Sequence, residues 1–291
     1  MDGVIELDEG ELDLDKTLQC GQTFSWHKVS GEEFFEESDP DEKYYTTTEG
    51  EVVILWQDDD GNLHYETSGE ISKDIGDFFR LHEPMDEVAD TIKKDDIMEE
   101  AVEQHRGLRL VNDDFVPTLI SYLCSPQMRI PRIKEMFDSI TEKYGEEIEY
   151  DGRRFKQFPS LYELSDVSER ELRRIGLGYR AKYVKSAIRH LIKGKVNRSE
   201  LEEMGYKGAH EELQKINGVG DKVADCVLLY SLGYLEAFPL DTWSWGAIEE
   251  HYPEHHHEDY HETADNMRDY FGEYTGYAQQ YLFHHIRQKE D

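Results

Sequence analysis

The sequence predicts an α+β protein in which an N-terminal, antiparallel β-rich domain (residues 1–95) is followed by an all-helical domain (residues 96–291). Two observations predict this division. Short β-prone runs alternate with turn signals before residue 95, whereas apolar residues recur at i, i+3 and i+4 after it. The 37% hydrophobic and 12% aromatic content is enough for a packed core, which argues against an acidic disordered chain.

The first domain is predicted from four β-prone runs and the turns between them. The runs are GQTFSWHKV, KYYTTT, EVVILW and NLHYETS, separated by the turn signals SGEE, SDPDE and DDDGN. A helix that begins near Ile75, in DIGDFFRLH, closes the domain.

The second domain is predicted from helical periodicity, with no internal repeat. The helical segments are DIMEEAVEQH, DFVPTLISYLC, IPRIKEMFDSITEKYG, ERELRRIGLGYRAKYVKSAIRHLIKG, GAHEELQKINGVGDKVADCVLLYSL, TWSWGAIEEHY and ETADNMRDYFGEYTGYAQQYLFHHIRQ. A histidine-rich run, HYPEHHHEDYHE, separates the last two. His257 and His261 in this run have the i, i+4 spacing of a helical metal-ligand pair, but we expect a solvated loop rather than a metal site.

The charge of the chain is strongly acidic, with 65 Asp and Glu against 32 Lys and Arg and a formal net charge of −33. A high net charge opposes aggregation, and salt screens its self-repulsion, so this composition is typical of a halophile's protein. Residues 151–200 are an exception, with 13 basic and 6 acidic side chains. That segment is either a footprint for a polyanion or a solvated helix face, and charge alone leaves both interpretations open.

The sequence features that bear on localisation indicate the cytosol of a prokaryote. No apolar run approaches the roughly 20 residues of a membrane helix, and the acidic N-terminus lacks the features of a secretory signal. The three cysteines are widely spaced, which indicates reduced thiols and excludes a four-cysteine iron–sulfur cluster within this chain. We therefore expect a monomeric, cytoplasmic protein that works in high salt and does not bind membranes.

The segment INGVGDKVADCVLL predicts a helix-hairpin-helix at about residues 208–232. Gly218 and Gly220 are expected to take positive φ in the turn, and the amides that follow can bind a phosphate. Lys222, on the first turn of the second helix, supplies an amine that can form a Schiff base at a sugar carbon. Asp241, in FPLDTW, has the pattern of a helix N-cap, and such a carboxylate can also face a cleft and stabilise positive charge. Capping alone remains an alternative for Asp241.

These residues resemble a known group. INGVGDKVADCVLLYSL with AFPLDTW is similar to the helix-hairpin-helix, Gly/Pro…Asp (HhH-GPD) superfamily, and within it to the 8-oxoguanine DNA glycosylase/AP lyase family, in a haloarchaeal-like form. LQCGQTFSWHKV, FPSLYELS, LRRIGLGYRAKYV and GYAQQYLF resemble further blocks of that family in the same order. The resemblance implies base-excision repair of oxidised guanine in double-stranded DNA, with Lys222 as the nucleophile at the deoxyribose C1′ and Asp241 as its electrostatic partner. It implies no required cofactor.

The resemblance also implies a pocket for a base that has been flipped out of the duplex. The carbonyl of Gly21 would accept the N7 hydrogen that distinguishes 8-oxoguanine from guanine. Phe283 and Cys226 would sandwich the base, and Gln279 would read its Watson–Crick edge. Taken singly, Gly21 also fits a turn, Cys226 a buried thiol and Phe283 the core.

Contacts to the rest of the DNA are implied in the same way. Arg132 and Arg180 match arginines that read the orphaned cytosine, and Tyr179 matches the wedge beside it. Gln127 stands where the animal enzymes begin a run of asparagines that fills the vacated stack, so the opposite-base preference stays open. Trp243 stands where those enzymes have a histidine near the lesion's 5′ phosphate.

A monovalent-cation site (K⁺ or Na⁺) is the last implied feature of the hairpin. Its ligands would be the backbone carbonyls of Gln214, Ile216 and Val219, and the ion would help to bind a phosphate.

Two other functions compete with this interpretation. A monofunctional glycosylase for alkylated purines, of the 3-methyladenine type, shares the fold but hydrolyses with water and usually lacks the hairpin lysine. A non-catalytic DNA-binding module would use the hairpin for phosphates only, and that role needs neither Lys222 nor Asp241. The lesion range, the strength of the lyase step and the optimal salt stay open.

Overall fold

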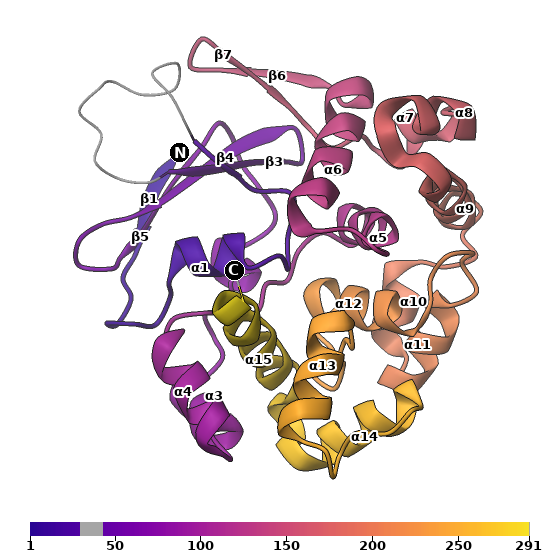
Figure 1. The fold of residues 1–291 in the computed structure, drawn as a ribbon. Helices are drawn as coiled ribbons and strands as arrows, with labels where there is room; N and C mark the ends of the chain where they lie inside the picture. The colour runs from indigo at the N-terminus through magenta and orange to yellow at the C-terminus, as the bar shows by residue number, and fades with distance from the viewer. Residues whose placement is uncertain (30–42, 291) are drawn as a thin grey trace.

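The computed structural model describes residues 1–29 and 43–290 and contains a sheet at one end and helices around it (Figure 1). The sheet is antiparallel, with five strands in the order β1-β5-β4-β3-β2. The strands are β1 (Asp2–Ile5), β2 (His27–Lys28), β3 (Tyr44–Thr48), β4 (Glu51–Gln57) and β5 (Leu63–Thr67). The predicted turns SGEE and SDPDE fall at residues 30–42, outside the described residues.

The strand β4 has buried side chains on both faces, which explains its continuous apolar run. Val53 and Leu55 belong to the main core, whereas Val52 and Ile54 pack with Phe155 in a second, smaller cluster. Phe155 lies on a two-stranded hairpin, β6 (Glu147–Tyr150) with β7 (Arg153–Lys156), that covers this face of the sheet.

This hairpin corrects the prediction that residues 96–291 are all helical. Its turn is Asp151-Gly152, with φ of 50° and 71°, and Asp-Gly between short β-prone runs is a strong hairpin signal. The run EIEYDGRRFK therefore has the sequence pattern of a hairpin, although it lies between segments with helical periodicity.

The segment GQTFSWHKV is also corrected, because only its last part forms a strand, β2. The preceding residues 14–19 are helical, and Gln22 holds the connection against the helical part of the molecule. Its side-chain amide donates to the carbonyls of Thr17 (2.9 Å) and Arg109 (2.7 Å), while its oxygen accepts the Val111 amide at 3.0 Å. These bonds place Gly21 next to the helices rather than in the sheet.

The predicted helical segments are found, and four further helices in the described residues lie outside them. The helices are α1 (Leu14–Gln19), α2 (Ile75–Phe78), α3 (Met85–Ile92), α4 (Asp96–Gln104), α5 (Phe115–Cys124), α6 (Ile130–Tyr144), α7 (Leu161–Ser165), α8 (Glu169–Leu172), η1 (Arg173–Leu177), η2 (Gly178–Arg180), α9 (Ala181–Ile192), α10 (Arg198–Glu203), α11 (Tyr206–Leu213), α12 (Asp221–Ser231), α13 (Thr242–His251), α14 (Tyr260–Phe271), η3 (Gly272–Tyr274) and α15 (Thr275–Glu290). The four that lie outside the predicted segments are α1, α3, α7 and α10. The periodic segment at 169–194 is divided into shorter pieces by Gly176 (φ 100°) and Gly178 (φ 57°). Both glycines take positive φ, which ends a right-handed helix.

The C-terminal helix α15 passes between α3–α4 and α13 and reaches the N-terminal region (Figure 1). Tyr281 on α15 donates to the Leu108 carbonyl (2.8 Å), and Arg287 donates to the Cys20 carbonyl (2.9 Å). One hydrophobic core accordingly runs from Leu12 to Leu282. The domain boundary at residue 95 stays a prediction, since the core crosses it. Within the described residues, none of the helices has the length and apolar character needed to cross a membrane.

Candidate active site

The helix-hairpin-helix is formed by α11 and α12, as predicted. Gly218 has φ of 100°, and a Cβ there would lie 2.3 Å from Cγ of Tyr183, so the turn requires glycine. Gly220 corrects the expectation of positive φ, because it is extended (φ −101°, ψ −176°) as the N-cap of α12. It makes no side-chain cap and has open space where a Cβ would stand, so the first amides of α12 are accessible to a partner.

Lys222, the second residue of α12, is held by two residues near the end of α5. Its ammonium lies 4.9 Å from the ring centroid of Tyr122 and donates to Ser125 Oγ at 3.3 Å. The cation–π contact and the hydrogen bond fix the amine at a half-buried position. Neither Tyr122 nor Ser125 was identified from the sequence, because SYLCS has the pattern of a core helix.

Tyr122 also reaches the segment that carries Gly21. Its hydroxyl donates to the carbonyls of Gly21 (3.2 Å) and Gln22 (3.1 Å). Gly21 has φ of 97°, and a Cβ there would lie 2.3 Å from Cδ1 of Ile130, so the chain can pass here only as glycine. One side chain therefore connects the predicted nucleophile with the carbonyl predicted to recognise the base.

Asp241 caps α13, and its Oδ1 accepts the Ser244 amide at 2.9 Å. The capping role predicted as the alternative is therefore present. Among the described residues, no ion pair within 4.0 Å joins Asp241 to Lys222. Both nevertheless act on the Cys226 thiol, whose pKa burial raises to about 12, with Lys222 lowering it and Asp241 raising it. The lysine and the carboxylate thus both lie close enough to this buried, neutral thiol to influence its pKa.

Gln279 and Phe283 lie one turn apart on α15. The buried Gln279 donates to the Pro239 carbonyl (3.0 Å) and to Ser244 Oγ (3.1 Å), so it is fixed against the loop that carries Asp241. Phe283 is half-buried, with the Arg287 guanidinium 5.5 Å from its ring centroid. Since Arg287 also donates to the Cys20 carbonyl, Phe283 is brought to the Gly21 side of the site.

Comparison with known proteins identifies the family of the chain. The family model for the 8-oxoguanine DNA glycosylase N-terminal domain matches residues 4–119, and that for the HhH-GPD superfamily of base excision DNA repair proteins matches residues 120–273. The chain is 32% identical over 247 residues to the N-glycosylase/DNA lyase OGG1 of Arabidopsis thaliana (83% of this chain, 66% of the relative). It is 31% identical over 261 residues to the N-glycosylase/DNA lyase of Saccharomyces cerevisiae (82% and 68%). The chain thus spans about two thirds of the length of these relatives.

A solved structure has the same fold. The Clostridium acetobutylicum 8-oxoguanine glycosylase/lyase, in complex with double-stranded DNA containing cytosine opposite 8-oxoguanine, superposes with a TM-score of 0.85 at 29% identity, over 97% of this chain and 93% of that one. The chain belongs to the 8-oxoguanine DNA glycosylase family of the HhH-GPD superfamily. Two adjoining domain models, and relatives that match more than four fifths of the chain, support this membership together.

The glycosylase's remaining predicted DNA contacts gather around the loop between α5 and α6. Gln127 is exposed there and has φ of 58°, a left-handed conformation that is uncommon for glutamine. Arg180 is buried, donates to the Pro126 carbonyl and lies 4.4 Å from the ring centroid of the exposed Tyr179. Arg132 pairs with Glu135 at 2.6 Å and donates to the Gly176 carbonyl at 3.2 Å.

Trp243 lies apart from this loop, 38% exposed on the first turn of α13. It is two residues from Asp241, so it stands at the same helix N-terminus as the capping carboxylate.

The loop predicted to hold a cation connects α11 to α12. The Ile216 carbonyl accepts the Val219 amide at 3.0 Å, and Gln214 donates its side-chain amide to Asp221 Oδ1 at 2.5 Å. His261 also contacts Asp221 Oδ1, at 3.1 Å, and so packs against the hairpin. In the part of the chain that the structure describes, no group of three or more His, Cys, Asp or Glu side chains is placed to hold a metal ion.

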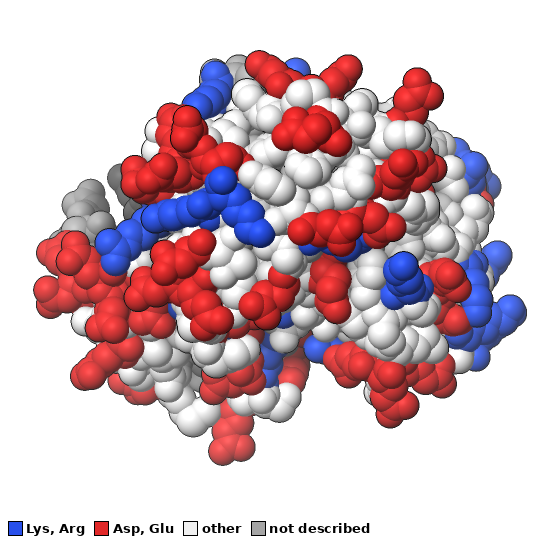
Figure 2. All heavy atoms as spheres, turned by 90° about the horizontal axis from the view of Figure 1, so that it is seen from below, with Lys and Arg blue, Asp and Glu red and all other residues white. Residues whose placement is uncertain are grey.

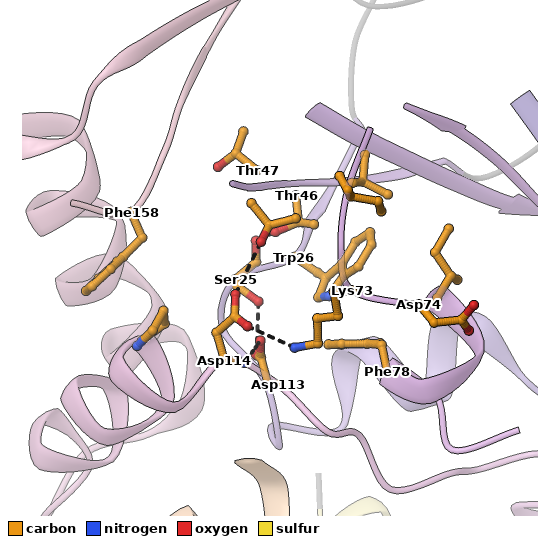
Figure 3. A pocket seen from close by; sticks show the side chains of 15 residues that line it. Ser25, Trp26, Thr46, Thr47, Lys73, Asp74, Phe78, Asp113, Asp114 and Phe158 are labelled. Carbon is orange, nitrogen blue, oxygen red and sulfur yellow. Dashed lines mark hydrogen bonds and ion pairs between the residues drawn. The ribbon is translucent and has the colours of Figure 1, made fainter. Parts of the chain in front are cut away.

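A separate pocket of about 50 Å³ lies between the sheet, α2 and the start of α5 (Figure 3). Its polar groups are already paired with one another. Asp113 accepts the Thr23 hydroxyl (2.5 Å) and the Ser25 hydroxyl (3.0 Å), and Lys73 pairs with Asp114 at 3.0 Å. Neither Lys222 nor Asp241 lines this pocket, and we assign it no ligand.

Proposed function

We propose that the protein is a bifunctional glycosylase that removes 8-oxoguanine from double-stranded DNA and then cleaves the strand at the abasic site. The observation that supports this most is the contact of Tyr122 with both the Lys222 amine and the Gly21 carbonyl. The nucleophile and the lesion-reading acceptor are thereby held at a fixed separation, as differential recognition of a flipped base requires.

The reaction starts with Lys222. Its amine attacks C1′ of the damaged nucleotide while the bond from C1′ to the base breaks, and the electron pair of that bond leaves with the base, which takes up a proton. The sugar ring opens, and the lysine nitrogen becomes the nitrogen of a Schiff base. Loss of a proton from C2′ expels the 3′ phosphate, and hydrolysis of the imine returns the free amine. The carboxylate of Asp241 stabilises the positive charge that develops at the sugar.

Base recognition is assigned to four residues around this amine. The Gly21 carbonyl accepts the N7 hydrogen of 8-oxoguanine, a proton that guanine lacks. Guanine has no hydrogen at N7, so its N7 lone pair would face the Gly21 carbonyl oxygen with no hydrogen bond between them. Burying two unpaired acceptors in this way is costly. Phe283 and the neutral thiol of Cys226 enclose the base, and Gln279 faces its Watson–Crick edge.

DNA contacts outside the pocket are proposed in three groups. The amides after Gly218 and Gly220 hold a phosphate, helped by a K⁺ or Na⁺ ion on the carbonyls of Gln214, Ile216 and Val219. A second group faces the base opposite the lesion, and it consists of Gln127, Arg132, Tyr179 and Arg180. Trp243 packs near the phosphate on the 5′ side of the lesion.

We further propose that the enzyme acts as a monomer in a high-salt cytoplasm. Acidic side chains cover much of the face in Figure 2, and basic side chains form smaller groups between them. At low salt the acidic side chains repel DNA and one another. In molar salt this repulsion extends only over a few ångströms, because ions screen it.

Borohydride trapping on a duplex with 8-oxoguanine opposite cytosine tests the function. Native protein and Lys222→Gln are compared at several salt concentrations, and we expect a covalent adduct with the native protein only. Release of the base without an adduct would point to hydrolysis by water, as in alkyl-purine glycosylases. Neither adduct nor release at any salt would leave a DNA-binding module.

A further inference from the structure

The helix α9 carries a basic groove beside the hairpin. An open hollow of about 340 Å³ runs along this helix, and its lining includes Lys182, Arg189, Lys193, Lys195 and the hairpin residue Asn217. The acidic side chain in the lining, Glu169, is already bonded to Arg173 at 2.7 Å. The groove is therefore positively charged, although the whole chain has a formal net charge of −33.

Four of the five lysine and arginine side chains that line this groove are exposed and have no acidic partner among the described residues. Among the described residues, no carboxylate lies within 4.0 Å of the charged atoms of Lys182, Arg189, Lys193 or Lys195. A cation near a helix C-terminus complements the helix dipole, which accounts for Arg189 and Lys193. It does not account for Lys182, which stands on the first turn, at the positive end of the dipole. Lys182 contacts the Tyr183 ring, 4.7 Å from its centroid, but no carboxylate. Four exposed cations without a carboxylate partner, on a chain with twice as many acidic as basic residues, indicate an anionic partner.

The groove continues the surface of the hairpin. Tyr183 of α9 packs against Gly218, where a Cβ would lie 2.3 Å from its Cγ, and Asn217 lines the groove itself. Gly220 has open space in front of it at the start of α12. The hairpin amides and the cations of α9 therefore lie along one side of the molecule.

We propose that this groove, the α9 groove, binds the phosphate backbone of duplex DNA beyond the phosphate held by the hairpin. The inference rests on the proposed function, because it takes duplex DNA as the substrate. The 12 residues of α9 extend about 18 Å at about 1.5 Å per residue. One DNA strand presents a phosphate about every 3.4 Å along the axis, so the groove matches a stretch of about five phosphates.

Binding to duplexes of two lengths tests the α9 groove. Fluorescence anisotropy measures the affinity for a tetrahydrofuran abasic analogue placed centrally in duplexes of about 9 and about 25 base pairs, from about 0.1 to 2 M KCl. The variant is Arg189→Gln/Lys193→Gln, and Arg189→Lys/Lys193→Arg retains its charge. Lys93→Gln/Lys94→Gln removes the same charge at the end of α3, on the other side of the molecule (Figure 1).

We expect the neutral α9 variant to bind the long duplex more weakly. The slope of log affinity against log salt should be lower by about 1.8, because each phosphate that a cation no longer neutralises reduces it by about 0.9. The short duplex, the charge-retaining variant and the α3 variant should behave like the native protein. Equally weakened binding of both duplexes, or an equal effect in the α3 variant, would show a general charge effect and overturn the proposal. Undamaged duplexes of both lengths are titrated in parallel, so the groove is tested even if 8-oxoguanine is not excised.

Discussion

The Tyr122 hydroxyl donates to two backbone carbonyls, while its ring supports the Lys222 ammonium. Tyr122→Phe removes the first interaction and keeps the second. A hydrogen bond contributes about 0.5–1.5 kcal/mol, so we expect the kcat/KM for 8-oxoguanine excision to fall about 3- to 10-fold. Cleavage of a preformed abasic site needs the amine but not base reading, and should stay near the native rate.

Tyr122→Leu is the matched variant, because it removes the ring as well. It should slow both excision and abasic-site cleavage. If Tyr122→Phe slowed the two reactions equally, its hydroxyl would serve the fold rather than lesion recognition.

Gln127 holds a left-handed backbone conformation, which costs a non-glycine residue roughly 1 kcal/mol and is better tolerated by asparagine. Gln127→Asn should therefore raise the free energy of unfolding by a few tenths to about 1 kcal/mol. Urea denaturation measures the change, and Met128→Asn, at the neighbouring exposed position, is the control. An unchanged or lower stability would mean that the Gln127 side chain makes a compensating contact in the free protein.

The site could be predicted from the sequence only where its chemistry is local. The spacing of Gly218, Gly220 and Lys222 fixes a hairpin and the start of a helix, and both are found. The sequence does not identify Tyr122 or Ser125 as site residues. Their contacts with Lys222 depend on how α5 packs against α12, and the periodicity of either segment does not reveal that packing. Gly21 and Gln279 are identified only by resemblance, since a backbone carbonyl and a side-chain amide more than 250 residues apart in the chain have no spacing that would reveal a shared site.

At the scale of elements, α15 meets α4 and the following loop through three buried histidines. The rings of His105 and His284 lie 4.6 Å apart, and those of His105 and His285 lie 5.5 Å apart. Burial lowers the pKa of His105 and of His284 to about 4, and it also lowers the pKa of His285. The folded protein thus keeps these imidazoles neutral at pH values where the unfolded chain protonates them.

The sign of the pH dependence follows from these pKa values. Between pH 6.5 and about 4 the unfolded state binds more protons, so stability falls as the pH is lowered. The loss is on the order of 1 kcal/mol per histidine for each pH unit. Urea denaturation from pH 7 to pH 4 measures it, and His105→Phe should give a shallower dependence. His82→Phe, at an exposed position, should leave the slope unchanged, and identical slopes in all three proteins would contradict the assignment.

The helical periodicity predicted most helices but not how they end. The segment ERELRRIGLGYRAKYV keeps its apolar spacing through Gly176 and Gly178, yet both glycines turn the chain and separate α8 from α9. A glycine within a helical pattern is either tolerated inside the helix or ends the helix, and only tertiary packing decides between the two. Here the break sets Tyr179 and Arg180 beside the loop after α5, where the proposed opposite-base contacts lie.

For the whole molecule, the charge distribution predicts how salt affects activity. The net charge of −33 opposes both the compact state and the approach of DNA, and the Debye length falls from about 10 Å at 0.1 M salt to about 3 Å at 1 M. Counterion release at the basic contacts works in the opposite direction, because it weakens DNA binding as salt rises. Two opposing trends produce a maximum in activity, and the excess of acidic charge places that maximum in high salt.

Excision of 8-oxoguanine in single turnover is measured from about 0.1 to 3 M KCl beside circular-dichroism melts. The excision rate should rise, peak near or above about 1 M and then decline, while the melting temperature keeps rising. Activity that is highest at the lowest salt and falls steadily would show that the basic contacts dominate and that the acidic surface does not hinder binding.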